Sequence, residues 1–418
     1  MGDALSQAAR TAARQARPLA SGRAPEDAAL TPRGAAGPVK AEAGATRDLR
    51  LDFFRGLALF LIFIDHIPEN LLSYFTLPSI GFSDAAEVFI FISGYTAALV
   101  YGRSLLRQGA LFATAQIYRR VWQLYVAHVF LFMIFTAEVS YTVLTVNNPM
   151  YNEELRVGDF LAEPHIAIIK ALLLQFQPTF LDILPLYIVL LASFPLVLFL
   201  LRQHLLAALV PALALYGAVQ AWGVALHGYP ADRPWFFNPL AWQLLFTIGG
   251  ACGFARAAER PLWPILRRLV APAAVVVAAS LVICLSWTLH GVWDGFPAIL
   301  LKPIWPVNKT NLAPLRLIHF LALAIVVVQL VPQESVLLRR RFARPFIICG
   351  QQSLHIFCLG ILLSVLGHFI LTEWSGGVPT QLAVNAAGIL LMVGTAMLIG
   401  WYRRLDREAA GAAAAGPG

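Results

Sequence analysis

Four ionisable residues interrupt an otherwise apolar stretch, RLDFFRGLALFLIFIDHIPENLL at positions 50–72: Asp52, Arg55, Asp65 and His66. An ionisable side chain at membrane depth costs roughly 2.5–3.5 kcal/mol on insertion scales, so such residues usually mark function. In an α-helix each residue turns the chain by about 100°, so the step from Arg55 to His66 is close to three full turns. The spacing places the guanidinium and the imidazole on one face, roughly 16 Å apart along the axis, and Asp52 joins the same face.

These residue types suit proton-transfer or group-transfer chemistry. The pKa of an unperturbed imidazole is about 6.5, so His66 can accept a proton near neutral pH or act as a nucleophile. Asp65 is its neighbour in sequence but lies about 100° round the helix. Asp84 and Glu87, from the next apolar segment, are therefore alternatives for orienting the imidazole. For Arg55 the alternative is a structural role, in which it pairs with an aspartate and lipid headgroups.

The composition defines the elements that must position these residues. The chain has 418 residues, of which 59% are hydrophobic and only 13% are charged. A soluble protein could not cover so apolar a composition with polar surface, which predicts an all-α polytopic membrane protein. The net charge of +8 lies in the N-terminal segment and in short loops, which argues against a nucleic-acid partner. The cysteines lack metal-site spacing, and we expect neither a metal nor a permanently bound cofactor.

Ten apolar runs are long enough to cross a bilayer, which takes about 17–25 residues. They are 50–67, 83–101, 117–142, 181–202, 205–223, 237–256, 268–289, 313–332, 345–372 and 379–402. A weaker run at 166–176 predicts an interfacial or re-entrant helix, with an eleventh span as the alternative. With the N-terminus inside, the inner loops and C-terminal tail carry 16 Lys and Arg and the outer side carries six. Positive residues concentrate on the cytoplasmic side, so we expect both termini to be cytoplasmic.

The ends of the chain differ from its middle. Residues 1–46 are rich in Ala, Gly, Pro and Arg without hydrophobic periodicity, which predicts a disordered cytoplasmic tail. Residues 405–418 predict a second, loose cytoplasmic tail, so the membrane domain spans 47–404. Trp and Tyr cluster in the outer loops. We attribute most of them to anchoring at the membrane interface, with a platform for stacking sugar rings as the alternative.

Several motifs resemble those of known membrane acyltransferases. LDFFRGLALFLIFIDH, with an arginine and a histidine separated by ten residues, resembles the first-helix pattern of the acyltransferase-three superfamily. FIFISGY resembles that superfamily's Ser-Gly-Phe motif, with Tyr95 in place of phenylalanine. From Arg47 to Trp401 the chain more closely resembles the OpgC family, through RDLRLDFFRG, GFSDAAEVFIFISGY, LDILPLYIVLL, NPLAWQLLF, KTNLAPLRLIHFLALA and CGQQSLHIF.

The OpgC resemblance implies a ten-helix fold in the bacterial inner membrane. It also implies transfer of a succinyl group from cytosolic succinyl-CoA to hydroxyls of osmoregulated periplasmic glucans. Under this reading His66 is the base or an acyl relay, helped by one of the carboxylates above. Arg55 and basic inner loops bind the donor phosphates, and Arg316 binds the succinyl carboxylate. The further candidates for substrate contacts are Asp52, Ser93, Tyr95, His319, Gln351, Gln352 and Ser353, for several of which interhelical packing or hydrogen bonding is the alternative.

Two other classes of function compete with an acyltransferase. A transporter or flippase also suits ten helices with buried charges, but such proteins often have two related halves, and no such repeat is evident. A scaffold subunit would not need His66 so near Asp65, Asp84 and Glu87. The expected partners are an acyl-CoA, a periplasmic glucan and the lipid bilayer. The sequence leaves open the acyl group, the glucan and the oligomeric state.

Overall fold

The computed structural model describes residues 48–146, 151, 154–230, 233–260, 262–288 and 307–415. Over these residues the chain is built from helices, with an isolated β-bridge between His227 and Pro234 and no strand. The predicted all-α architecture is therefore confirmed. The tail expected at 1–46 lies outside the described residues.

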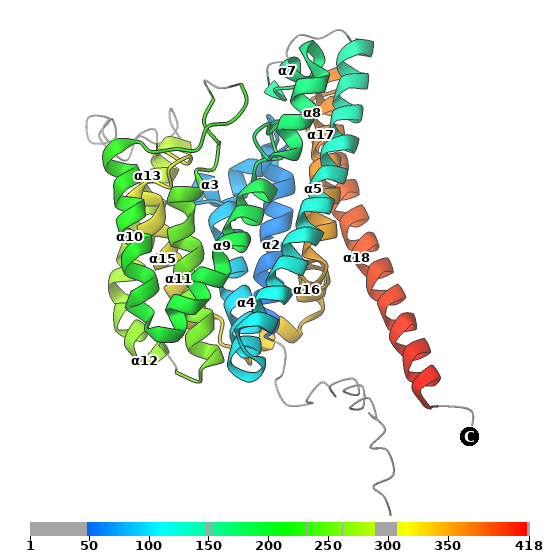
Figure 1. Cartoon of the computed structure of the whole chain (residues 1–418). Helices are drawn as coiled ribbons and strands as arrows, with labels where there is room; N and C mark the ends of the chain where they lie inside the picture. Colours follow the sequence, from blue (N-terminus) through cyan, green and yellow to red (C-terminus); the bar gives the residue numbers. More distant parts are fainter. Residues whose placement is uncertain are drawn as a thin grey trace, which may run out of the picture. The chain divides into compact units, whose positions relative to one another are not determined.

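Seven helical segments in the described part of the chain are long and apolar enough to cross a membrane. They are α4 (Ala85–Gln108), α5 (Ala110–Val146), α9 (Ile183–Gln203), α10 (Leu205–Trp222), the run of α12 (Trp263–Leu266), η2 (Arg267–Leu269) and α13 (Val270–Thr288), α17 (Ser353–Glu373) and α18 (Val378–Ala415). Their number and composition indicate a multi-pass membrane protein. Figure 1 shows the helices.

The three other predicted spans are helices as well, but they fall outside that set. They are α2 (Leu49–Asp65), α11 (Pro239–Ala257) and α15 (Pro314–Leu330). Both α2 and α15 have 17 residues, at the lower end of what a bilayer requires. The count of ten spans and the cytoplasmic side of the termini stay predictions.

Short helices connect or flank these segments. They are η1 (Leu71–Phe75), α3 (Leu77–Ile80), α7 (Gly158–Ala162), α8 (Pro164–Leu172), η3 (Val336–Arg339), η4 (Arg341–Ala343) and α16 (Arg344–Gln351). The weak apolar run at 166–176 corresponds to α8, whose nine residues rise only about 14 Å. A helix this short cannot cross a hydrocarbon core of about 30 Å, so α8 is not an eleventh span. The Tyr125 hydroxyl of α5 donates a 2.9 Å hydrogen bond to the carbonyl of Leu172, the last residue of α8.

Glycines let the site helices approach their neighbours at backbone distance. On α4, a side-chain carbon at Gly94 would overlap the Phe246 carbonyl of α11. On α2, the same substitution at Gly56 would overlap the Phe346 carbonyl of α16, and Gly350 of α16 faces α2 in the same way. Close contacts between small residues of this kind hold membrane helices together without a hydrophobic driving force. They fix α2 and α4, which carry most of the predicted site.

Two expectations about helix continuity are corrected. The predicted span 345–372 is two helices, α16 and α17, separated at Gln352, whose backbone (φ −112°, ψ 29°) leaves the helical region. Non-helical backbone at membrane depth is tolerated where protein buries it, and Gln352 is buried. At the other end, α18 continues to Ala415, where a loose tail was expected from residue 405. Its alanine-rich sequence explains this, because alanine is the strongest helix former.

Candidate active site

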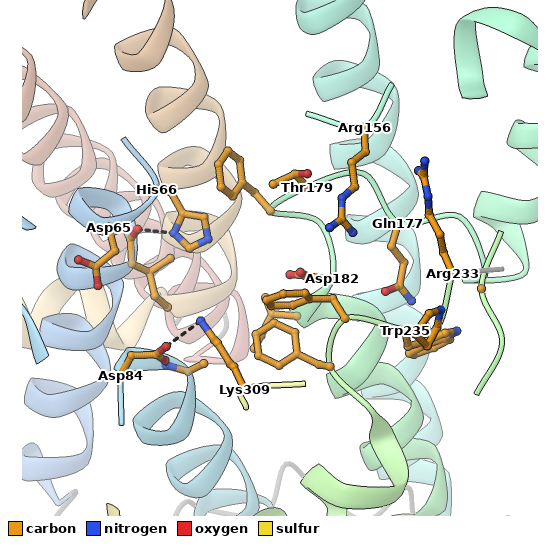
Figure 2. Close-up of a pocket in the computed structure, with 18 of the residues that line it drawn as sticks. Asp65, His66, Asp84, Arg156, Gln177, Thr179, Asp182, Arg233, Trp235 and Lys309 are labelled. Atoms are coloured by element: carbon orange, nitrogen blue, oxygen red, sulfur yellow. Dashed lines mark hydrogen bonds and ion pairs between the residues drawn. The ribbon is translucent and has the colours of Figure 1, made fainter. Parts of the chain in front are cut away.

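A cavity of about 440 Å³ opens where α2 ends and where α4 and α9 begin (Figure 2). Its polar lining combines helix termini with loops that precede α7, α9, α11 and α15. These polar residues include Asp65, His66, Asp84, Arg156, Gln175, Gln177, Thr179, Asp182, Arg233 and Lys309. Of these, Asp65, His66 and Asp84 are among the site residues expected from the sequence.

His66 follows the last residue of α2 and faces this cavity. Its Nδ1 is hydrogen-bonded to the Ile62 carbonyl one turn earlier. A carbonyl oxygen can only accept a hydrogen bond, so Nδ1 of the neutral ring carries the proton. The Nε2 atom then has the lone pair and can accept a proton. The Phe180 ring meets the imidazole edge-on, with ring centroids 4.5 Å apart, and limits its rotation.

None of the three carboxylates that were candidates for orienting the imidazole accepts its Nδ1 hydrogen bond. Asp65 lines the cavity, but the Nδ1 hydrogen bond goes to the Ile62 carbonyl. Asp84 and Glu87 form a capping box at the start of α4. In this box Asp84 accepts a 2.8 Å hydrogen bond from the Ala86 N–H, and Glu87 accepts one of 2.9 Å from the Asp84 N–H. Their geometry serves the helix terminus first.

Asp84 and Glu87 also hold two cations in a buried cluster. Arg316 lies 2.7 Å from Glu87 and 3.1 Å from Asp84, and Lys309 lies 2.7 Å from Asp84. Burial opposes the charges of Asp84 and Lys309, but their mutual attraction outweighs it. The attraction raises the pKa of Lys309. Together with the charge of Arg316, it lowers the pKa of Asp84 well below its usual range. Lys309 reaches the cavity, whereas Arg316 is buried behind Asp84 and does not line it.

The loop that carries Lys309 is held by hydrogen bonds that its backbone carbonyls accept from residues at the start of α11. The Trp242 indole donates to the Lys309 carbonyl at 3.2 Å and to the Thr310 carbonyl at 3.1 Å. The Asn238 N–H donates to Thr310 as well, at 3.0 Å. The ammonium group also lies 5.4 Å from the centre of the Phe237 ring. In the sequence, Lys309 is one of the positive residues of the outer loops and was not predicted to be a site residue. Its position seven residues before Arg316 is the feature that could have indicated its place in the site.

A second cavity of about 240 Å³ lies along α2 toward Arg55. The Arg55 guanidinium donates a 2.7 Å hydrogen bond to the Thr96 hydroxyl, and Arg120 and Ser353 line the same space. Phe357 lines both cavities. The predicted face of α2 therefore has a cavity at each end, with an aromatic side chain as part of the wall between them.

The remaining predicted residues divide between this second cavity and the helix contacts. Ser93 lines the second cavity with Ser353. His319 bonds through Nδ1 to the Ser83 hydroxyl at 2.8 Å and so supports the segment that leads into Asp84. Neither cavity is lined by the other candidates among the described residues, which are Asp52, Tyr95, Arg316, Gln351 and Gln352.

Aromatic residues of the loop before α11 also face the larger cavity. Tyr229, Trp235, Phe236 and Phe237 are all part of its lining. The loop turns back on itself, because the Gly228 N–H donates to the Arg233 carbonyl at 2.9 Å. For these four residues the arrangement favours the sugar-stacking alternative over anchoring in the bilayer. The aromatic residues of segment 289–306 lie outside the described part.

Comparison with known proteins gives a match along most of the chain. A family model described as "OpgC protein" matches residues 47–404. The search of curated proteins gives no match.

Proposed function

The chain belongs to the OpgC family, and on this premise we propose that it transfers a succinyl group from cytosolic succinyl-CoA to hydroxyl groups of periplasmic glucans. Family membership indicates a membrane acyltransferase that modifies glucans. The proposal adds the donor, the acceptor, the bacterial inner membrane and the role of His66. In it the Arg55 end of α2 faces the cytoplasm and the His66 end faces the periplasm.

The observation that carries this proposal is the pair of cavities along one uninterrupted helix. Arg55 lines one cavity and His66 lines the other, and Phe357 is common to both. A donor from one side and an acceptor from the other can therefore meet at the imidazole while each keeps its own compartment. A soluble donor and a periplasmic acceptor require this arrangement.

The donor half of the site supplies cations and hydroxyl groups. Arg55 and Arg120 can pair with phosphate groups of the coenzyme through charge-assisted hydrogen bonds, next to Thr96 and Ser353. The pantetheine arm then extends along α2 and past Phe357, so that the thioester reaches His66. The acceptor half supplies the aromatic side chains of the loop before α11, on which sugar rings can stack.

The reaction needs a base for the glucan hydroxyl and a group that stabilises the tetrahedral oxyanion. The hydroxyl oxygen attacks the thioester carbonyl carbon, and its proton passes to Nε2 of His66. When the C–S bond breaks, the coenzyme leaves as a thiolate and takes that proton, which restores the neutral imidazole and leaves an ester on the glucan. Throughout, Nδ1–H stays on the Ile62 carbonyl. Lys309, in the wall of the same cavity, is placed to stabilise the oxyanion. An acyl-histidine relay would use the same Nε2.

Substitution of His66 tests the proposal. With membranes that contain the protein, label from succinyl-CoA should pass to added glucan, and His66→Asn should reduce this transfer by about 100- to 10,000-fold. Asn preserves some hydrogen bonding but has no basic nitrogen. The matched control is His165→Asn, because His165 is exposed on α8 and lines neither cavity. Near-normal turnover in His66→Asn would contradict the base, and glucan movement without consumption of succinyl-CoA would favour a flippase.

A further inference from the structure

Three cations line the larger cavity, and their partners differ. Lys309 pairs with Asp84 at 2.7 Å, and Arg233 pairs with Asp159 at 3.0 Å. Arg156 makes no hydrogen bond or ion pair with any residue that the structure describes. Asp182 lines the same cavity without a hydrogen bond to Arg156. Arg156 is thus a cavity cation whose donors are available to a ligand.

The backbone at Arg156 is held in an unusual conformation. Its φ angle of +55° lies in the left-handed region, which costs a residue with a side chain roughly 1–3 kcal/mol and persists where the surroundings impose it. On either side, Leu155 and Val157 are 1% and 0% exposed. The Leu155 carbonyl accepts a 3.3 Å hydrogen bond from the N–H of Thr179, which itself lines the cavity. The buried neighbours therefore fix the backbone that carries the Arg156 side chain.

The Arg156 side chain extends into the cavity. Figure 2 shows the Arg156 guanidinium extending between Thr179 and Gln177, on the side of Asp182. Phe180, which contacts the His66 ring, has a positive φ of its own, +75°. Two residues with positive φ thus line the cavity. Phe180 lies against the imidazole, and Arg156 carries a cation. Strained conformations of this kind cluster at functional sites.

We propose that Arg156 binds the free carboxylate of the acyl group and so selects a dicarboxylic acyl donor over a neutral one. This inference rests on the proposed acyl transfer and identifies the residue that recognises the acyl group. A guanidinium matches a carboxylate with two parallel hydrogen bonds. The wall also holds the carboxylates of Asp65 and Asp182, which repel the carboxylate of the acyl group, and a cation beside that group offsets this repulsion.

Besides Arg233, which pairs with Asp159, two other cations could have this role, and both are already neutralised. Arg316, the candidate from the sequence, is 8% exposed and has both Glu87 and Asp84 as partners. Lys309 has its charge balanced by Asp84 at 2.7 Å. A carboxylate that binds to either would have to compete with an existing ion pair, whereas at Arg156 it forms a new one.

The test compares two donors of equal chain length. Succinyl-CoA carries a carboxylate where butyryl-CoA carries a methyl group, and kcat/KM is measured for each with a fixed glucan concentration. The variant is Arg156→Gly, because glycine adopts positive φ without strain and so removes the guanidinium without disturbing the loop. We expect the ratio of succinyl to butyryl transfer to fall roughly 10- to 100-fold, and Arg156→Lys to recover part of it.

Arg233→Ala is the matched control, because Arg233 lines the same cavity but is paired with Asp159. Its donor ratio should stay that of the wild type. An equal loss for both donors in Arg156→Gly would overturn the inference and assign Arg156 to the glucan or to the loop. A wild-type protein that transfers neither acyl group would overturn the proposed function itself, and the inference with it.

Discussion

At His66, one backbone carbonyl determines which ring nitrogen is available for chemistry. The bond from Nδ1 to the Ile62 carbonyl fixes the tautomer as a carboxylate would, but it adds no negative charge beside the ring. The nearby carboxylates are thereby free for other tasks. Asp84 and Glu87 neutralise buried cations and cap α4. The base and the charge cluster are therefore separate groups, and the cluster reaches the cavity only through Asp84 and Lys309.

This separation predicts a structural role for Arg316. Arg316→Ala should leave Glu87, which is 0% exposed, as a buried carboxylate without its cation. Breaking a buried pair in this way typically costs about 3–5 kcal/mol. We expect a large fall in the thermal unfolding midpoint of the detergent-purified protein. In Lys309→Met the fall should be smaller, because Lys309 is one-third exposed. An Arg316→Ala protein of normal stability with altered donor preference would restore the role that the sequence suggested.

The sequence predicted those site residues that one helix places together. The spacing of Arg55 and His66 depends only on helix geometry, and both line cavities as a shared face requires. It could not predict Lys309 and Arg156 as site residues. They lie in loops far apart in the chain, and only the packing of α2, α4, α9 and α15 brings those loops to one cavity.

Among the helices, the contact of α4 with α11 depends on the absence of side chains. Gly94→Ala would place a methyl group against the Phe246 carbonyl, and a backbone atom cannot move aside as a side-chain end can. Overpacking of this kind usually costs about 1–3 kcal/mol. We expect a lower unfolding midpoint in detergent, and reduced glucan acylation because Ser93 is adjacent.

The control for this change is Gly394→Ala on α18, where the added carbon would meet nothing within 4 Å. In an open helical position, alanine is favoured over glycine by about 0.5–1 kcal/mol. Gly394→Ala should therefore be neutral or slightly stabilising. Equal effects of the two substitutions would mean that the α4–α11 contact is looser than the structure indicates.

The extents of the helices were largely predictable, and their interruptions were not. The apolar run 205–223 corresponds to α10, Leu205–Trp222, because hydropathy alone decides where a lipid-facing helix lies. The break at Gln352 lies two residues after Gly350, which packs closely against the Asp52 carbonyl of α2, and the burial of Gln352 protects the freed backbone groups. A contact between residues so far apart in the sequence cannot be predicted from the local composition of either segment.

For the whole molecule, the unequal distribution of positive charge predicts which side faces the cytoplasm. Single cysteines at Val224 and Ser375, which are exposed, should react with an impermeant thiol reagent added outside intact cells. Cysteines at Gln108 and Glu259, exposed in the loops predicted to be internal, should react only after the membrane is opened. The four native cysteines are replaced first. Outside labelling at Glu259 would contradict the proposed orientation or the number of spans before it.

The unbroken course of α2 has a consequence for the size of the donor. From Arg55 to its end at His66 the helix is continuous and contains no proline, so the axial separation of the two residues, roughly 16 Å, cannot adapt to the molecule that is bound. The fixed length of the helix therefore selects donors by their length. A carrier whose phosphates bind at Arg55 brings its thioester to the imidazole only if its arm is long enough. A truncated thioester can contact either Arg55 or His66, but not both. The length of a single helix thereby sets which carriers can serve both ends at once.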